Sequence, residues 1–89
     1  NIIMDINQLI LIIKKKLKAN ILIQKISVED KTFLHKKHQS HQGGKFHIKL
    51  IIHSNDLNKQ NKVKSTKRIY SILSEEIKKY IHSIQILIT

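Results

Sequence analysis

Cysteine is absent from the 89 residues, which excludes disulfides, thiolate metal ligands and a cysteine nucleophile within the chain. Proline and tryptophan are also absent, and the only two glycines, Gly43 and Gly44, do not form a phosphate-binding loop. The longest apolar run, residues 9–13, is far short of the roughly 20 residues that a membrane-spanning helix needs. A chain of this length has a thin core, so we expect residues 1–89 to form a single domain without a large catalytic cleft.

Acidic residues are scarce. The chain has six Asp and Glu residues and 17 Lys and Arg residues, which gives a net charge of +11. Such an excess suits nucleic acid, an anionic surface or an acidic partner. A compositional explanation competes with this one, because Ile, Lys and Asn are all encoded by A/T-rich codons. Arginine, which makes bidentate phosphate contacts better than lysine, occurs only once, so charge alone leaves nucleic-acid binding open.

Hydrophobic spacing predicts two long helices. Residues 5–19 repeat apolar side chains at helical intervals, with Asp5 as a cap and lysines near the end. A second helix should begin at Ser65 or Thr66 and run to Tyr80. Its predicted apolar stripe consists of Ile69, Tyr70, Ile72, Leu73, Ile77 and Tyr80. Glu75 and Glu76 should pair with the lysines at positions 78 and 79. A short helical turn is expected at residues 62–64.

Three strands are predicted, at residues 21–29, 46–53 and 81–88. In the second, Ile48, Leu50 and Ile52 alternate with His47, Lys49 and His53, so both histidines should lie on the exposed face. A polar loop should span residues 30–45. Only that loop joins the first two strands, which should therefore be antiparallel, whereas a helix returns the last strand parallel to a neighbour. The prediction is an α/β (α+β) sandwich with a three-stranded mixed sheet and the helices on one face.

Five segments from residue 28 onward carry a recognisable pattern. They are Val28-Glu29-Asp30, His35-Lys36-Lys37-His38, His47-Ile48-Lys49-Leu50 leading to Ser54, Ile69-Tyr70-Ser71-Ile72-Leu73, and Glu75-Glu76-Ile77 running to Ile81-His82-Ser83-Ile84. Together they resemble the BolA-like family. His82, which opens the last strand after a helix with paired acids, falls on the family's most characteristic residue. The sequence departs from the family where an Arg-His-Arg triplet usually enters the long helix. It has Ser65, Thr66 and Lys67 there, and Lys59 replaces a family glycine, so a phosphate contact by that triplet is in doubt.

The resemblance implies a fold like the type II K-homology domain and a protein that is not an enzyme. It also implies partnership with a monothiol glutaredoxin, with which the chain would share a [2Fe–2S] cluster in cluster trafficking or iron regulation, glutathione being supplied through the partner. Imidazole can replace thiolate on one iron of such a cluster, and a chain without cysteine needs a partner for the remaining ligands. The expected ligands are His82 and His35, with His38 as the alternative to His35. Each of them could instead be a structural or solvated histidine. Alone, the chain should be a monomer in an intracellular compartment, cytoplasmic or mitochondrial, without membrane association.

The alternative function is that of a nucleic-acid-binding transcriptional regulator. DNA or RNA would contact Lys62, Lys64, Lys67 and Arg68 at the start of the long helix. K-homology domains bind single strands through a Gly-x-x-Gly loop, and residues 62–67 contain no glycine. The loop histidines at 35, 38 and 41 are weak evidence for zinc. No motif of a catalytic triad is recognisable, and Glu75 and Glu76 are adjacent on a helix and point different ways, so an enzyme is not expected.

Overall fold

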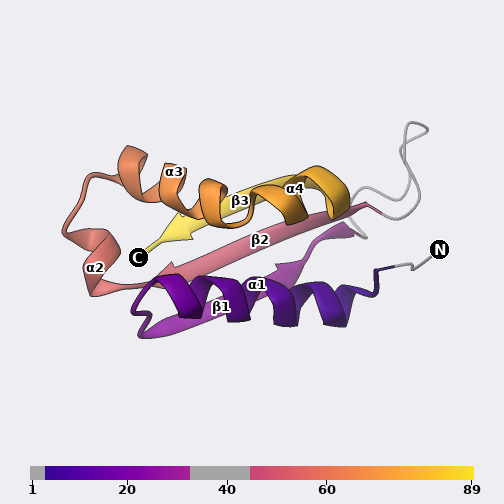
Figure 1. Ribbon diagram of the computed structural model, residues 1–89, viewed down its shortest axis with the longest axis horizontal. Helices are drawn as coiled ribbons and strands as arrows, with labels where there is room; N and C mark the ends of the chain where they lie inside the picture. The colour runs from indigo at the N-terminus through magenta and orange to yellow at the C-terminus, as the bar shows by residue number, and fades with distance from the viewer. Residues whose placement is uncertain (1–3, 33–44) are drawn as a thin grey trace.

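A three-stranded sheet with its helices on one face makes up the computed structural model, which describes residues 4–32 and 45–89 (Figure 1). The elements in chain order are α1 (Ile6–Asn20), β1 (Lys25–Asp30), β2 (Phe46–His53), α2 (Asn55–Asn58), α3 (Lys62–Ile72), α4 (Ser74–Tyr80) and β3 (Ile81–Ile88). The central strand, β2, pairs antiparallel with β1 and parallel with β3. This arrangement confirms the predicted mixed sheet and both predicted pairings.

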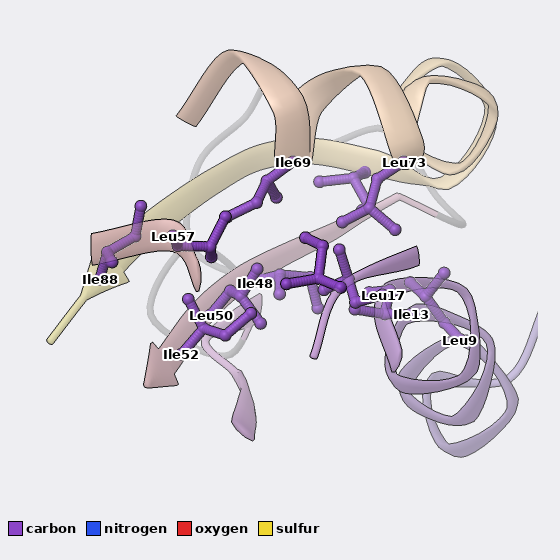
Figure 2. Close-up of a cluster of buried hydrophobic side chains, with 12 residues drawn as sticks. Leu9, Ile13, Leu17, Ile48, Leu50, Ile52, Leu57, Ile69, Leu73 and Ile88 are labelled. Carbon is purple, nitrogen blue, oxygen red and sulfur yellow. The ribbon is translucent and has the colours of Figure 1, made fainter. Parts of the chain in front are cut away.

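The core lies between β2 and the helices. Ile48, Leu50 and Ile52 of β2 are buried, and they pair in register with Ile84, Ile86 and Ile88 of β3. The helices contribute Leu9, Ile13, Leu17, Ile69 and Leu73, all fully buried, and Figure 2 shows these side chains converging on the strand. Each fully buried Leu or Ile contributes about 1.5–3 kcal/mol, so this single layer of contacts holds the helices on the sheet.

The two ends of α1 are fixed by side chains. Gln8 accepts a hydrogen bond from the Asp5 amide at 3.3 Å, which satisfies a backbone donor at the first turn. At the other end, the side-chain nitrogen Nδ2 of Asn20 donates to the Lys16 carbonyl at 2.8 Å. Arg68 of α3 donates from Nη2 to the Asn20 carbonyl at 2.8 Å, which joins the two long helices at this end of the fold.

The second long helix differs from its prediction. It starts earlier, at Lys62, because Asn61 caps it by accepting a hydrogen bond from the Lys64 amide at 2.8 Å. Ser65 is not the cap. It is fully buried and donates to the Leu57 carbonyl at 2.7 Å. The short helix is α2 rather than a turn at 62–64, and a break at Leu73 (φ −97°, ψ 13°) separates α3 from α4.

Two smaller predictions were also wrong. The first strand begins at Lys25 rather than at residue 21, because Ile21 follows α1 directly and enters the core, where it is 4% exposed. Tyr70 was placed in the buried stripe of the second helix but is 41% exposed. The buried line of α3 passes through Ile69 and Leu73, four residues apart, and Tyr70 lies beside it.

An ion pair connects α4 to α1. Glu76 was expected to pair with its own helix, but its side chain is buried and its Oε2 lies 2.6 Å from Lys16 Nζ on α1. The expected pairing within α4 is made by Glu75, whose Oε2 is 3.7 Å from Lys79 Nζ. Hydrogen bonding to Glu76 raises the pKa of Lys16 above its usual value. The pair fixes the position of α4, the helix that leads directly into β3.

None of the helices in the described residues is long and apolar enough to span a membrane.

Candidate functional site

Two histidines lie at the same end of the sheet. His47 is the second residue of β2 and His82 the second residue of β3, and parallel pairing brings the starts of the two strands together. The pairing is irregular here. Phe46 is opposite Ile81 and His47 is opposite Ser83, which leaves His82 as the extra residue of a β-bulge. Bulges re-aim side chains and are frequent beside functional sites. His82 therefore departs from the alternation that governs the rest of β3.

The imidazole rings of His47 and His82 are neighbours. Their centroids are 4.9 Å apart and their planes are inclined by 58°. His82 is exposed, whereas His47 is only 8% exposed. The end of the sheet thus combines one imidazole that a partner can reach with a second that is held inside the fold.

His47 is held by hydrogen bonds from β3 and from the segment that follows β1. Its Nδ1 lies 2.7 Å from the Ser83 hydroxyl on β3. Its amide donates to Thr32 Oγ1 at 3.1 Å, and its carbonyl accepts from the Lys31 amide at 2.7 Å. The Thr32 hydroxyl is itself bonded to the Asp30 carboxylate. The segment that follows β1 therefore fixes the His47 backbone, and β3 fixes its ring.

A shallow hollow surrounds His47. Its lining comprises Lys31, His47, Ile48, Lys49, Ser83, Ile84 and Gln85. Lys31 forms an ion pair with Glu29, whose Oε1 is 3.2 Å from the ammonium group, and both side chains are more than one-third exposed. The site is consequently open to solvent and bordered by cations, which suits contact with a protein surface better than enclosure of a small substrate.

The expectation that His47 would be an exposed strand residue was wrong. His47 is only 8% exposed and its ring is bonded to the Ser83 hydroxyl, although its position in β2 alternates with the core residues. His53, the other histidine of β2, is half-buried at the far end of the strand and bonds through Nδ1 to the Thr89 carbonyl at 2.9 Å. The predicted ligands His35 and His38 lie outside the described residues.

The signal that could have found the pair was present in the sequence. Both histidines occupy the second position of strands predicted to belong to one sheet, and parallel strands begin at the same edge. Each histidine was interpreted from the pattern of its own strand alone, so the proximity of His47 and His82 was missed.

Nucleic-acid contact was predicted at the start of the long helix. Lys62, Lys64 and Lys67 are exposed there, and the first turn of α3 contains no acidic residue. Lysines at a helix N-terminus add to the positive end of the helix dipole, so this is a concentrated positive surface. Arg68 differs from the lysines because its guanidinium is bonded to the Asn20 carbonyl. That contact gives Arg68 a structural role.

The described residues do not form a closed metal site. Among them, no group of three or more His, Asp or Glu side chains is placed to hold one metal ion.

Comparisons with known proteins agree with this class of small α+β domain. The family model described as BolA-like protein matches residues 17–89. The DNA-binding transcriptional regulator BolA of Haemophilus influenzae is 32% identical over 73 residues, which make up 82% of this chain and 68% of that protein. The chain belongs to the BolA-like family.

Solved structures support the same fold. The BolA domain of SufE1 from Arabidopsis thaliana superposes with a TM-score of 0.74 at 26% identity, over 89% of this chain and 87% of that one. BolA1 from the same plant gives a TM-score of 0.72 at 23% identity, over 86% of this chain and 85% of its own. Both have the architecture that positions the two histidines in this chain.

Proposed function

We propose that this chain is a non-enzymatic partner protein that shares a [2Fe–2S] cluster with a monothiol glutaredoxin and uses His82 as a ligand. The observation that carries the proposal is the exposed imidazole of His82, which a β-bulge turns out of the strand pattern at the edge of the sheet. Its role would be cluster trafficking or iron regulation, in the cytoplasm or in mitochondria.

The donor set fits a shared cluster. The chain has no cysteine, so two thiolates must come from outside, one from the glutaredoxin and one from its glutathione. Imidazole replaces thiolate in known [2Fe–2S] centres and raises their reduction potential. His82 supplies one imidazole, and His35 or His38 of the loop supplies the second.

The test is the visible absorption and circular dichroism spectrum of the chain mixed with a monothiol glutaredoxin, glutathione, iron and sulfide. We expect a heterodimer spectrum that differs from that of the glutaredoxin alone, and we expect His82→Ala to abolish the difference. His53→Ala is the matched control, because His53 lies at the opposite end of the same sheet. A heterodimer spectrum that is unchanged in His82→Ala would show that His82 is structural.

A second candidate function is nucleic-acid binding. Two observations favour it: the exposed Lys62, Lys64 and Lys67 at the positive end of α3, and the relative named as a DNA-binding regulator. The order of helices and strands is compatible with a type II K-homology-like domain, which would place this helix start against a phosphate backbone. Binding by this surface would be electrostatic and independent of sequence.

Fluorescence anisotropy of labelled oligonucleotides at several salt concentrations tests this candidate. The double variant Lys64→Glu and Lys67→Glu should bind more weakly and lower the slope of log affinity against log salt by about 0.7–0.9 for each phosphate that it no longer neutralises. The control is the double variant Lys15→Glu and Lys78→Glu, which makes the same charge change at exposed positions on α1 and α4. Equal reductions of affinity in the two double variants would indicate attraction by net charge without a defined surface.

A further inference from the structure

Among the residues that the structure describes, the His82 ring contacts the ring of His47. Within residues 4–32 and 45–89 the His82 imidazole makes no hydrogen bond, and its ring faces that of His47 at 4.9 Å. An exposed side chain without a polar contact samples several rotamers, and ordering it costs conformational entropy. The His47 ring is therefore placed to influence the direction of the His82 imidazole in the free protein.

The His47 ring is fixed from the side of β3. The Ser83 hydroxyl, 2.7 Å from His47 Nδ1, belongs to the residue that follows His82 in the chain. This bond crosses from β3 to β2 at the bulge, where Ser83 takes the position opposite His47. The bond holds the His47 ring against His82, and it also connects Ser83, the residue after the bulge, to the central strand β2.

The His47 backbone is fixed from the side of β1. Thr32 accepts the His47 amide proton at 3.1 Å, and the Lys31 amide donates to the His47 carbonyl at 2.7 Å. His47 is thus bonded through its backbone on one side and through its ring on the other. A rigid buried ring next to a mobile exposed one is suited to orienting it.

We infer that His47 and Ser83 are positioning residues for His82: the Ser83 hydroxyl holds the His47 ring, and that ring sets the direction in which His82 presents its nitrogen to the cluster. The inference rests on the proposed function for the identity of the ligand. Residues that orient metal-binding histidines change metal affinity or activity by about 10–100-fold when mutated. We expect removal of the His47 ring to accelerate release of the cluster by about tenfold.

The experiment uses the complete chain and has two readouts. The first is the rate at which a chelator removes the cluster from the heterodimer with a monothiol glutaredoxin. The second is nuclear magnetic resonance of the His82 ring in the free chain, which reports rotamer averaging and needs no cluster. His47→Ala should release the cluster about ten times faster and increase averaging of the His82 ring. Ser83→Ala should produce a smaller change of the same kind, and Ser83→Thr, which keeps the hydroxyl, should restore wild-type behaviour.

His53→Ala is the matched control, since it removes a histidine of the same strand with a comparable bond from Nδ1, 2.9 Å from the Thr89 carbonyl. It should leave both readouts unchanged. If His47→Ala fails to fold, His47→Phe and Ser83→Ala carry the test. Phe keeps a ring beside His82 but cannot bond to Ser83. In His47→Phe, the cluster release rate and the averaging of the His82 ring should therefore exceed those of the wild type and Ser83→Thr. Both should remain below the values expected for a His82 side chain without any restraint.

The outcomes separate the two proposals. If His82→Ala leaves the heterodimer spectrum unchanged, the shared-cluster function is wrong, and the resonance measurement still decides whether His47 orients His82. If His82→Ala alters the spectrum while His47 and Ser83 variants match the wild type in both readouts, the positioning role is wrong and the proposed function stands.

Discussion

Replacing Ser54 with alanine removes two hydrogen bonds from one buried hydroxyl. The hydroxyl donates to the Leu22 carbonyl at 2.8 Å and accepts from the Leu57 amide at 3.2 Å, and Ser54 is fully buried. Loss of a helix N-cap costs about 1 kcal/mol. The bond to the Leu22 carbonyl, which is only partly buried, contributes about 0.5–1.5 kcal/mol more. With the middle of that range, we expect Ser54→Ala to reduce the free energy of unfolding by about 2 kcal/mol, which lowers Tm by roughly 8–16 °C in a domain of this size.

Thermal unfolding followed by circular dichroism measures this effect against two comparison variants. Asn61→Ala removes only a cap, because Asn61 accepts from the Lys64 amide at 2.8 Å from an exposed position. It should cost about 1 kcal/mol. Ser27→Ala, on an exposed position of β1, should change stability by less than about 0.5 kcal/mol. If Ser54→Ala is no more destabilising than Asn61→Ala, the bond to Leu22 contributes nothing and the reasoning is refuted.

Two further predictions concern the ion pair and the core. Because Glu76 raises the Lys16 pKa above 10.5, the stability from this pair is present below that pH and is lost as pH rises through the raised pKa. The Tm of Glu76→Gln should therefore fall less steeply with pH above about 10 than the Tm of the wild type. Equal slopes of Tm against pH would show that the ion pair does not contribute to this pH dependence. Leu50→Ala, at a fully buried position of the central strand, should cost about 3 kcal/mol in urea unfolding. Leu22→Ala, at a position 68% exposed, should change stability by less than about 0.5 kcal/mol, and equal costs would disprove the assigned core.

The bounds of β2 and β3 were predictable to the residue because apolar side chains alternate with other side chains over most of each strand. The division of the second helix into α3 and α4 was not. No glycine or proline marks the break at Leu73, and that residue is fully buried in the core, so the break depends on tertiary packing. Ser65 illustrates the same limit. As a serine before an apolar stripe it resembles a cap, but a partner eight residues earlier, the Leu57 carbonyl, gives it a buried position inside the helix.

The candidate site was predictable in part. His82 was singled out as a candidate by the family resemblance, and the structure adds its exposure and its place in the bulge. The burial of His47 could not be read from alternation, because an outward position on a sheet with one uncovered face is normally exposed. Its bonds to Ser83 and Thr32 join it to two other parts of the chain, which alternation along β2 does not show. The link between Glu76 and Lys16 was missed for the same reason, since the two residues are distant in sequence.

The placement of His82 also depends on α4, which ends at Tyr80, two residues before it. This seven-residue helix is too short to be stable alone, and the Glu76 carboxylate attaches it to α1 through Lys16. On the other side of His82, Ser83 attaches β3 to the central strand through His47. The backbone that carries His82 is thus anchored both before and after the bulge, by contacts with different elements. If a partner binds the exposed imidazole as proposed, the backbone that carries it is already fixed, so the ordering cost at this residue is confined to the side-chain rotamers.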